Sequence, residues 1–343
     1  MDVAAGPGGV RCRDASAAAG QPMAGTAPRA DVWIAVEHPL GWGDAGLARS
    51  GHGVRILMAR GPRANPVTDP TTTTGPVDTR PATGGPPGTS PGTVGPAGTQ
   101  DPAGARVWVG YATGTPTLRV GRIDRPEDVA AWDLSAIAAG SLRGWGRAEA
   151  DPLLLVCANG RRDRCCGHEG GRLAEALWRG PHRDRVLTCT HLGGHRFAPT
   201  ALLLPAGALH GRLDEASASD LVARAHAGRT PTASLRGFSS LDEPAQVADA
   251  HARGITGYDT LSPLQVDLDP LRVDLGPSQV DLDPLRADLG PDRDPDRMGA
   301  TVRGWDPRDP DRSLAVGLVR TGGSALMACG RDPEATTRWL PAP

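Results

Sequence analysis

The sequence predicts an α/β protein with a mixed sheet and flanking helices. Short apolar runs rich in β-branched residues recur along the chain, and stretches with the apolar spacing of amphipathic helices lie between them. One run, PLLLVC (152–157), is apolar throughout, as in a strand that is buried on both faces. Such alternation of strands and helices is typical of an α/β sandwich.

The first half of the chain contributes four predicted strands and one helix. The segments VWIAV and VRILMA, between Asp31 and Arg60, are apolar and β-rich, with glycine-rich polar sequence between them. RVWVGYA (106–112) and TLRVGRI (117–123) alternate in the manner of half-buried strands. DLSAIAAGSLRGW (133–145) has the pattern of a helix.

The second half repeats this alternation. The predicted elements are strands at 152–157, 185–189 and 201–205, helices at 172–178 and 214–227, and a hairpin of strands 313–320 and 324–330 around Thr321-Gly322-Gly323. In the helix at 172–178, Leu173, Leu177 and Trp178 lie on one face, which predicts packing against the sheet.

Low-complexity segments divide the chain. One is rich in Thr, Gly and Pro, and another repeats QVDLDPLR-x-DLGP at 265–277 and 279–291, where regular prolines oppose both helices and central strands. The predicted organisation is a disordered head (1–30), an N-terminal α/β region (31–150) with a disordered insertion (61–104), a second α/β domain (151–235), a low-complexity linker with the 14-residue duplication (236–300), and a C-terminal hairpin and tail (301–343).

Composition excludes several functional classes. The formal net charge is −2 over 343 residues, and all 37 basic residues are arginine, which is typical of a GC-rich genome rather than of a nucleic-acid-binding surface. No apolar run approaches the roughly 18 residues of a membrane helix, and no signal peptide is apparent. We therefore expect a cytoplasmic protein with no nucleic-acid or membrane partner. In that compartment, cysteines are more often metal-binding or reactive than disulfide-bonded.

Two motifs carry the candidate chemistry. Cys157 ends a predicted strand and begins CANGRRDRCCG, and His191-Leu192-Gly193-Gly194-His195 follows the next strand along the chain. Strand ends of an α/β sheet converge at one edge, so thiolates and imidazoles meet there. This mixture of donors favours zinc or an iron–sulfur cluster over magnesium or calcium. The two glycines favour a loop between the histidines over a helix.

The second thiolate is either Cys165 or Cys166. Cys166 is preferred, because it precedes Gly167 and a helix whose amino terminus favours an anionic group. Around these residues Arg164 and Arg196 are predicted to support the ligands or to form a docking surface for an anionic redox partner, although arginines in a solvated loop would have the same pattern. Asp163 is predicted to orient an arginine or a ligand imidazole.

CANGRRDRCCG, CTHLGGHRFAP and the segments LLLP and HGRL resemble the sucrase/ferredoxin-like family. The resemblance implies a thioredoxin-like ferredoxin domain that carries a [2Fe–2S] cluster with two Cys and two His ligands. Its ligands here would be Cys157, Cys166, His191 and His195, with the histidines at the Cys-x3-Cys spacing of ordinary thioredoxin-like ferredoxins. No paired-carboxylate site of the glycosidase kind supports the word sucrase.

The sequence therefore predicts an electron-transfer protein with an unidentified redox partner or reductase, rather than a stand-alone catalyst. Two neutral imidazoles in place of two thiolates favour a higher reduction potential, as in Rieske centres. A structural zinc site with the same four ligands is the first alternative, although Cys-x8-Cys is wider than a usual zinc knuckle. A thiol–disulfide oxidoreductase using the vicinal Cys165-Cys166 pair is the second.

Overall fold

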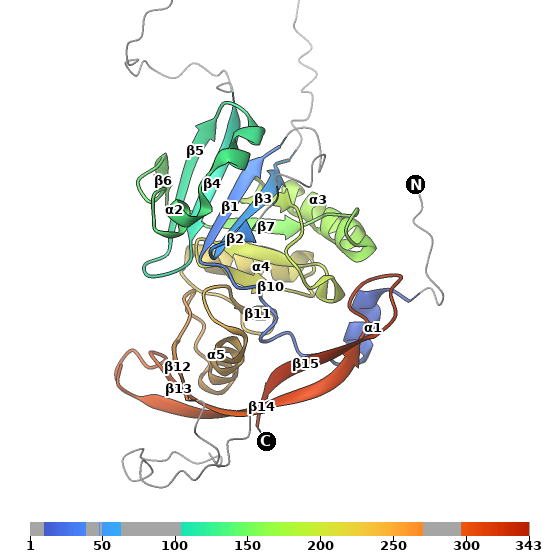
Figure 1. Ribbon diagram of the computed structural model, residues 1–343, viewed down its shortest axis with the longest axis vertical. Coiled ribbons are helices and arrows are strands. Elements are labelled where there is room, and N and C mark those ends of the chain that lie inside the picture. Colours follow the sequence, from blue (N-terminus) through green and yellow to red (C-terminus); the bar gives the residue numbers. More distant parts are fainter. Residues whose placement is uncertain (1–9, 39–47, 49, 63–103, 270–295, 343) are drawn as a thin grey trace, which may run out of the picture. The chain divides into compact units, whose positions relative to one another are not determined.

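The computed structural model describes residues 10–38, 48, 50–62, 104–269 and 296–342 (Figure 1). These ranges belong to one compact unit. None of the helices within them combines the length and the apolar composition that a bilayer crossing needs.

Within the described residues, a mixed sheet of eleven strands confirms the predicted α/β class. In spatial order the strands are β11 (Leu235–Phe238), β10 (Ala208–His210), β9 (Ala201–Leu204), β7 (Leu153–Cys157), β8 (Val186–Cys189), β3 (Val54–Arg60), β1 (Val32–Glu37), β4 (Ala105–Tyr111), β5 (Thr117–Ile123) and β6 (Arg147–Glu149), and β2 (Ser50–Gly51) pairs with β3. The pairs β1/β3 and β7/β8 are parallel, and the other pairs are antiparallel.

The large sheet consists of two halves with the same pairing scheme. In one half the order is β3-β1-β4-β5 and in the other it is β8-β7-β9-β10, and each half begins with its parallel pair. The halves join where β3 and β8 pair antiparallel, with Ala59 opposite Cys189. The sequence predicted a smaller α/β region before the second domain, and in the structure its strands continue the same sheet.

Alternate side chains of the strands face two different cores. Leu154 and Val156 of β7 pack with helices α3 (Gly171–Arg179) and α4 (Glu215–His226), whereas Leu155 and Cys157 point to the opposite face. Successive side chains of a strand point to opposite faces, and both faces of β7 are buried, so the strand is apolar at every position. Cys157 therefore emerges on the face away from α3 and α4.

Helices also cover the N-terminal half. The 3₁₀ helix η1 (Pro126–Ala131) and helix α2 (Leu134–Ala138) pack on Ile34, Ile56 and their neighbours. The helix predicted at 133–145 is thus shorter than expected, because Gly140 has φ +101° and cannot continue it.

A second, antiparallel sheet lies in the C-terminal part. Its strands are β12 (Gln265–Asp269), β13 (Arg297–Arg303), β14 (Ser313–Ala325) and β15 (Glu334–Pro341), in that order. Helix α5 (Glu243–Thr256) packs Val247, Ala248 and Ala252 against this sheet (Figure 1).

Three parts of the predicted organisation need correction. The head is not disordered from residue 10 onward, because helix α1 (Cys12–Ala18) is present and Cys12 is fully buried. The predicted linker at 236–300 contains helix α5 and strand β12. Helix α5 is ordered because it buries one of its faces, together with the Asp249–Arg253 ion pair. The C-terminal hairpin turns after Ala325 rather than at 321–323, where β14 runs on.

Other predictions lie outside the described residues. The disordered insertion at 61–104 falls almost wholly at 63–103, and the duplication falls mostly at 270–295. The first copy of the duplication begins with strand β12.

Candidate metal centre

The two sequence motifs start at the same edge of the large sheet. β7 and β8 are parallel neighbours in which Cys157 is paired with Cys189, so the loops that follow them leave side by side. The first loop leads into a π-helical turn (Cys166–Gly170) and α3, and the second leads into a 3₁₀ turn (His195–Phe197). This arrangement agrees with the predicted convergence of strand ends.

The four predicted ligands fall in two overlapping groups that share Cys166. Cys157, Cys166 and His191 each offer a ligand atom within 4.8 Å of the other two, and His195 is grouped in the same way with Cys166 and Asp163. The imidazoles of His191 and His195 stack, with centroids 4.4 Å apart and planes inclined by 21°. Both thiols are fully buried. These buried Cys, His and Asp groups could hold a metal.

Glycines allow the histidine loop to take its shape. Gly193 and Gly194 have φ values of +82° and +74°, which residues with a side chain rarely adopt. A Cβ on Gly194 would lie 2.5 Å from Nη2 of Arg236. The fully buried Arg236 donates hydrogen bonds to the Gly193 carbonyl at 3.0 Å and to Thr26 Oγ1 at 3.1 Å. The loop is therefore packed closely around one guanidinium group.

Close backbone contacts also position Cys166. A Cβ on Gly170 would lie 1.9 Å from the carbonyl oxygen of Cys157, and a Cβ on Gly167 would lie 2.4 Å from Cα of Gly160. Glycine at both positions lets the turn that carries Cys166 pack directly on the end of β7. The two thiols meet because no side chain separates their backbones at these points.

The thiol pair is asymmetric in its proton affinity. Hydrogen bonds from Cys166, from His191 and from the backbone of Leu192 lower the pKa of Cys157 well below its ordinary value, against burial, which raises it. The hydrogen bond to Cys157 and burial raise the pKa of Cys166. Burial and the neighbouring His191 lower the pKa of His195. The site thus favours one thiolate and a neutral His195 imidazole, which are forms that bind metals.

The donor set fits a thiolate–imidazole metal group. The Nδ1 atoms of His191 and His195 are buried, and neither has a hydrogen-bond partner among the described residues. Buried polar atoms are normally satisfied, so two such atoms beside two buried thiols indicate that another group completes the site. Thiolates and imidazoles together suit iron–sulfur clusters and zinc.

The remaining predicted residues lie around this centre in different ways. Asp163 is buried and accepts hydrogen bonds from the backbone N–H groups of Cys165 and Cys329, at 2.8 and 2.9 Å. Arg164 is exposed. Arg196 is partly buried, stacks over Phe197 with its guanidinium carbon 4.5 Å from the ring centroid, and donates to Met327 Sδ.

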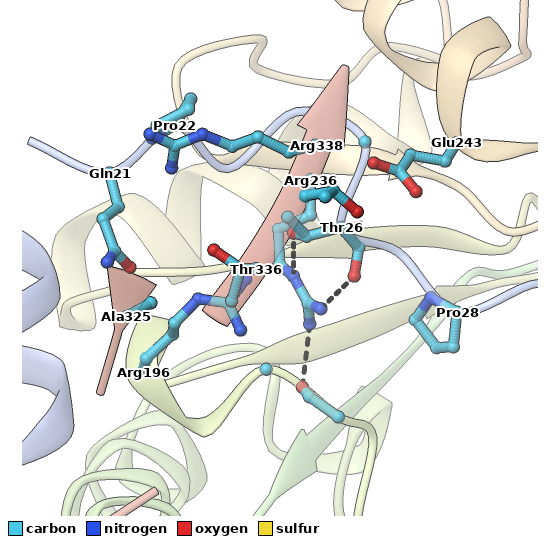
Figure 2. A pocket seen from close by; sticks show the side chains of 14 residues that line it. Gln21, Pro22, Thr26, Pro28, Arg196, Arg236, Glu243, Ala325, Thr336 and Arg338 are labelled. Atoms are coloured by element: carbon cyan, nitrogen blue, oxygen red, sulfur yellow. Dashed lines mark hydrogen bonds between the residues drawn. The ribbon is translucent and has the colours of Figure 1, made fainter. Parts of the chain in front are cut away.

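A cavity of about 240 Å³ adjoins the histidine loop. Figure 2 shows Arg236 bonded to Thr26 in its wall, with Arg196 and Arg338 among the other lining residues. Burial lowers the pKa of Arg196, and the positive charge of Arg338 lowers it further. The arginine predicted beside the ligands is therefore part of a basic wall at this cavity.

Sequence reasoning missed two cysteines near the centre. Cys165 does not point to Cys157 but contacts Cys12, with 3.7 Å between the sulfurs, and Cys329, at 3.2 Å. Cys12 lies in the predicted disordered head and Cys329 in the C-terminal hairpin, so the sequence alone gave no reason to join them. Cys189 is buried, and burial raises its pKa.

The comparisons with known proteins place this centre in a family context. Buried thiols and imidazoles at the edge of a mixed sheet define the region as a candidate metal-binding α/β domain. Residues 103–237 match the sucrase/ferredoxin-like family model, so the chain contains a sucrase/ferredoxin-like domain. No curated protein and no solved structure gave a significant match. The family match includes the four predicted ligands and Cys165, whereas Cys12 and Cys329 lie outside it.

Proposed function

We propose that this protein transfers electrons through a [2Fe–2S] cluster held by Cys157, Cys166, His191 and His195. The observation that carries the proposal is the convergence of these four side chains from two loops, with two buried imidazole nitrogens that lack partners among the described residues. The sucrase/ferredoxin-like match over the same residues supports a ferredoxin-type cofactor.

We also propose that the domain has a thioredoxin-like fold. Its strand order is β8-β7-β9-β10, with β7 and β8 parallel, β9 and β10 antiparallel to their neighbours, α3 between the parallel strands and α4 after β10. This βαβ-ββα connectivity is the pattern expected of a minimal thioredoxin-like domain. It supports the assignment because it brings the two ligand loops to one edge.

When bound, the cluster supplies one-electron chemistry, and two neutral imidazole ligands give it a higher reduction potential than four thiolates would. The protein contributes the surroundings. Burial of both thiols excludes water, and Arg236 fixes the histidine loop through the Gly193 carbonyl. The hydrogen bond from the Leu192 backbone stabilises a thiolate at Cys157.

The redox partner proposed here is an acidic protein or reductase domain. Arg162 and Arg164 are exposed on the loop between the two cysteine ligands. Positive charge close to a redox centre favours docking of an anionic partner and speeds association at low salt. The proposal therefore includes an electron-transfer rate that falls as ionic strength rises.

A mononuclear zinc ion is the second candidate occupant. The ligand atoms of Cys157, Cys166 and His191 lie within 4.8 Å of one another, which is compact enough for one tetrahedral ion. A zinc-bound protein would be colourless and would contain no acid-labile sulfide. A vicinal disulfide enzyme receives no support, because Cys165 and Cys166 contact different thiols.

The test is anaerobic purification of the full chain followed by iron and sulfide analysis and EPR of the reduced protein. Two irons and two sulfides per chain, with a Rieske-like rhombic signal, are expected for a cluster with two histidine ligands. Cys166→Ser should abolish the visible absorption, and Cys165→Ser is the matched control that should retain it. A protein with zinc and no sulfide, or a chromophore that survives Cys166→Ser, would overturn the proposal.

A further inference from the structure

Three cysteines from distant parts of the chain form a second cluster beside the first. Cys12 begins helix α1, Cys165 lies in the ligand loop, and Cys329 lies between β14 and β15. The three sulfurs are mutually close, at 3.7 Å for Cys12–Cys165, 3.2 Å for Cys165–Cys329 and 3.5 Å for Cys12–Cys329. All three residues are free cysteines, and Cys12 and Cys165 are buried.

We propose that Cys12, Cys165, Cys329 and Asp163 bind one zinc ion, at a site separate from the proposed cluster. Zinc lies about 2.3 Å from thiolate sulfur, and tetrahedral geometry then separates two sulfurs by about 3.8 Å. The observed separations of 3.2–3.7 Å approach this value and far exceed the roughly 2.05 Å of a disulfide. An ion about 2.3 Å from all three sulfurs would lie about 1.1 Å out of their plane, compared with about 0.8 Å for an ideal tetrahedral centre.

Asp163 completes the donor set. Its Oδ1 and Oδ2 atoms lie 3.8 and 3.9 Å from the Cys12 sulfur, close to the roughly 3.6 Å expected between oxygen and sulfur on one zinc ion. Backbone N–H groups of Cys165 and Cys329 donate hydrogen bonds to the two oxygens of the carboxylate, at 2.8 and 2.9 Å. Among the described residues, its hydrogen-bond partners are these two N–H groups and the Cys12 thiol, none of which carries a full positive charge. A divalent cation would offset the cost of burying the carboxylate there.

Two backbone N–H groups point to sulfurs of this cluster. The backbone N–H of Cys12 points to the Cys329 sulfur at 3.5 Å, and a backbone hydrogen bond from Arg13 reaches Cys165. Such N–H···S contacts are typical of the surroundings of metal-bound thiolates. Each thiol releases its proton to solvent as zinc binds.

Soft donors and short spacing together select the ion. Three thiolates favour zinc over magnesium or calcium, and sulfurs this close to one another fit a single ion better than they fit the separate iron atoms of a larger cluster.

The site would fasten both ends of the described chain to the ligand loop. Helix α1 carries Cys12, and the β14–β15 connection carries Cys329, yet both reach Cys165 and Asp163. Asp163 is also grouped with Cys166 and His195 of the first site. Zinc would therefore hold α1 and the β14–β15 connection beside the proposed cluster, and loss of zinc should expose both segments to proteases.

The first experiment measures zinc and iron in the anaerobically purified full chain with Zn²⁺ supplied. We expect one zinc per chain in addition to iron. Cys12→Ser and Cys329→Ser should each lower zinc retention against a chelator by at least about tenfold while the visible chromophore remains. Cys189→Ala, a buried cysteine outside both groups, is the matched control and should keep the zinc. Unchanged zinc in the Cys12/Cys329 double variant would overturn the proposal.

X-ray absorption at the zinc edge of the wild-type protein provides a test that needs no variant to fold. Three sulfur neighbours at about 2.3 Å and one oxygen are the expected shell. Wild-type protein that binds no zinc, a shell with fewer than three sulfurs, or a disulfide among these cysteines in place of zinc would refute the site. The variants also distinguish the two sites. Zinc that is lost on Cys166→Ser, and not on Cys12→Ser or Cys329→Ser, would belong to the first site.

Discussion

Substituting alanine for Gly194 tests whether the histidine loop is fixed around Arg236. Gly194 has φ +74°, and its added Cβ would lie 2.5 Å from the guanidinium nitrogen Nη2 and 2.7 Å from Cζ. Arg236 is fully buried, so its side chain has no solvent into which it can withdraw. The neighbouring Gly193 is a matched control, because it also has a positive φ, +82°, but a Cβ added there would meet no atom of the described residues within 4 Å.

The two variants share one cost and differ in another. A left-handed backbone conformation costs a residue with a side chain about 1–2 kcal/mol, and both variants carry this cost. Gly194→Ala must also displace the guanidinium from the Gly193 carbonyl or from Thr26, and a hydrogen bond to a charged group contributes about 1.5–3 kcal/mol. We therefore expect Gly194→Ala to be the less stable variant by about 1.5–3 kcal/mol, or roughly 10- to 150-fold in the unfolding equilibrium.

Urea unfolding of both variants, followed by far-UV circular dichroism at fixed pH and salt, measures this difference from the midpoints. The fraction of protein that carries the visible chromophore provides a second measurement, because the loop holds both histidines. Equal destabilisation by the two substitutions, or a larger effect at Gly193, would show that Arg236 does not constrain the loop.

Three further predictions concern the scaffold. Burial lowers the pKa of His210 from 6.5 to about 3. Between these two pH values the unfolded chain binds a proton that the folded chain does not, so the free energy of unfolding falls by about 2 kcal/mol from pH 7.5 to pH 5. Urea titrations at both pH values test this, and His210→Gln should flatten the dependence. Gly170→Ala should prevent assembly of the visible chromophore, because the added Cβ would meet a carbonyl oxygen of β7. Gly171→Ala is the control: its Cβ meets no atom of the described residues within 4 Å and its backbone is helical, so thermal unfolding should show a gain in stability of up to about 1 kcal/mol. Asp249→Asn breaks the buried i,i+4 ion pair with Arg253 and should lower the free energy of unfolding by about 3–5 kcal/mol. Asp220→Asn breaks the exposed i,i+4 pair with Arg224 and should lower it by only about 0.3–0.5 kcal/mol. Similar midpoints in denaturant for these two variants would refute the argument.

The sequence predicted most of the large sheet, because its strands carry strong local patterns. The run at 152–157 becomes β7 and the run at 185–189 becomes β8, each within one residue of the expected bounds. Parallel pairing of these two strands makes the convergence of their following loops a matter of topology. Local patterns in the sequence were therefore sufficient to predict that Cys157 lies close to the loop that carries the histidines.

The second cysteine cluster could not be predicted in this way. Cys12 and Cys165 are 153 residues apart in the sequence, and Cys165 and Cys329 are 164 apart. Helix α1 has seven residues and lies in an Ala- and Gly-rich segment, so its composition resembles that of a disordered head. Its order comes from tertiary contacts, such as those from Arg212 to the Ser16 and Gln21 carbonyls, which local pattern does not record.

The neighbouring cysteines at 165 and 166 explain how one loop could serve both proposed sites. Both residues have helical backbone angles, and successive side chains on a helix point about 100° apart. Cys166 therefore faces Cys157 and the histidines, while Cys165 faces Cys12 and Cys329. In an extended strand the same two thiols would point to opposite faces of the sheet and could not both lie beside Asp163. The helical turn thus allows a single carboxylate to lie beside both groups, and the two proposed sites are adjacent because Cys165 and Cys166 are consecutive residues.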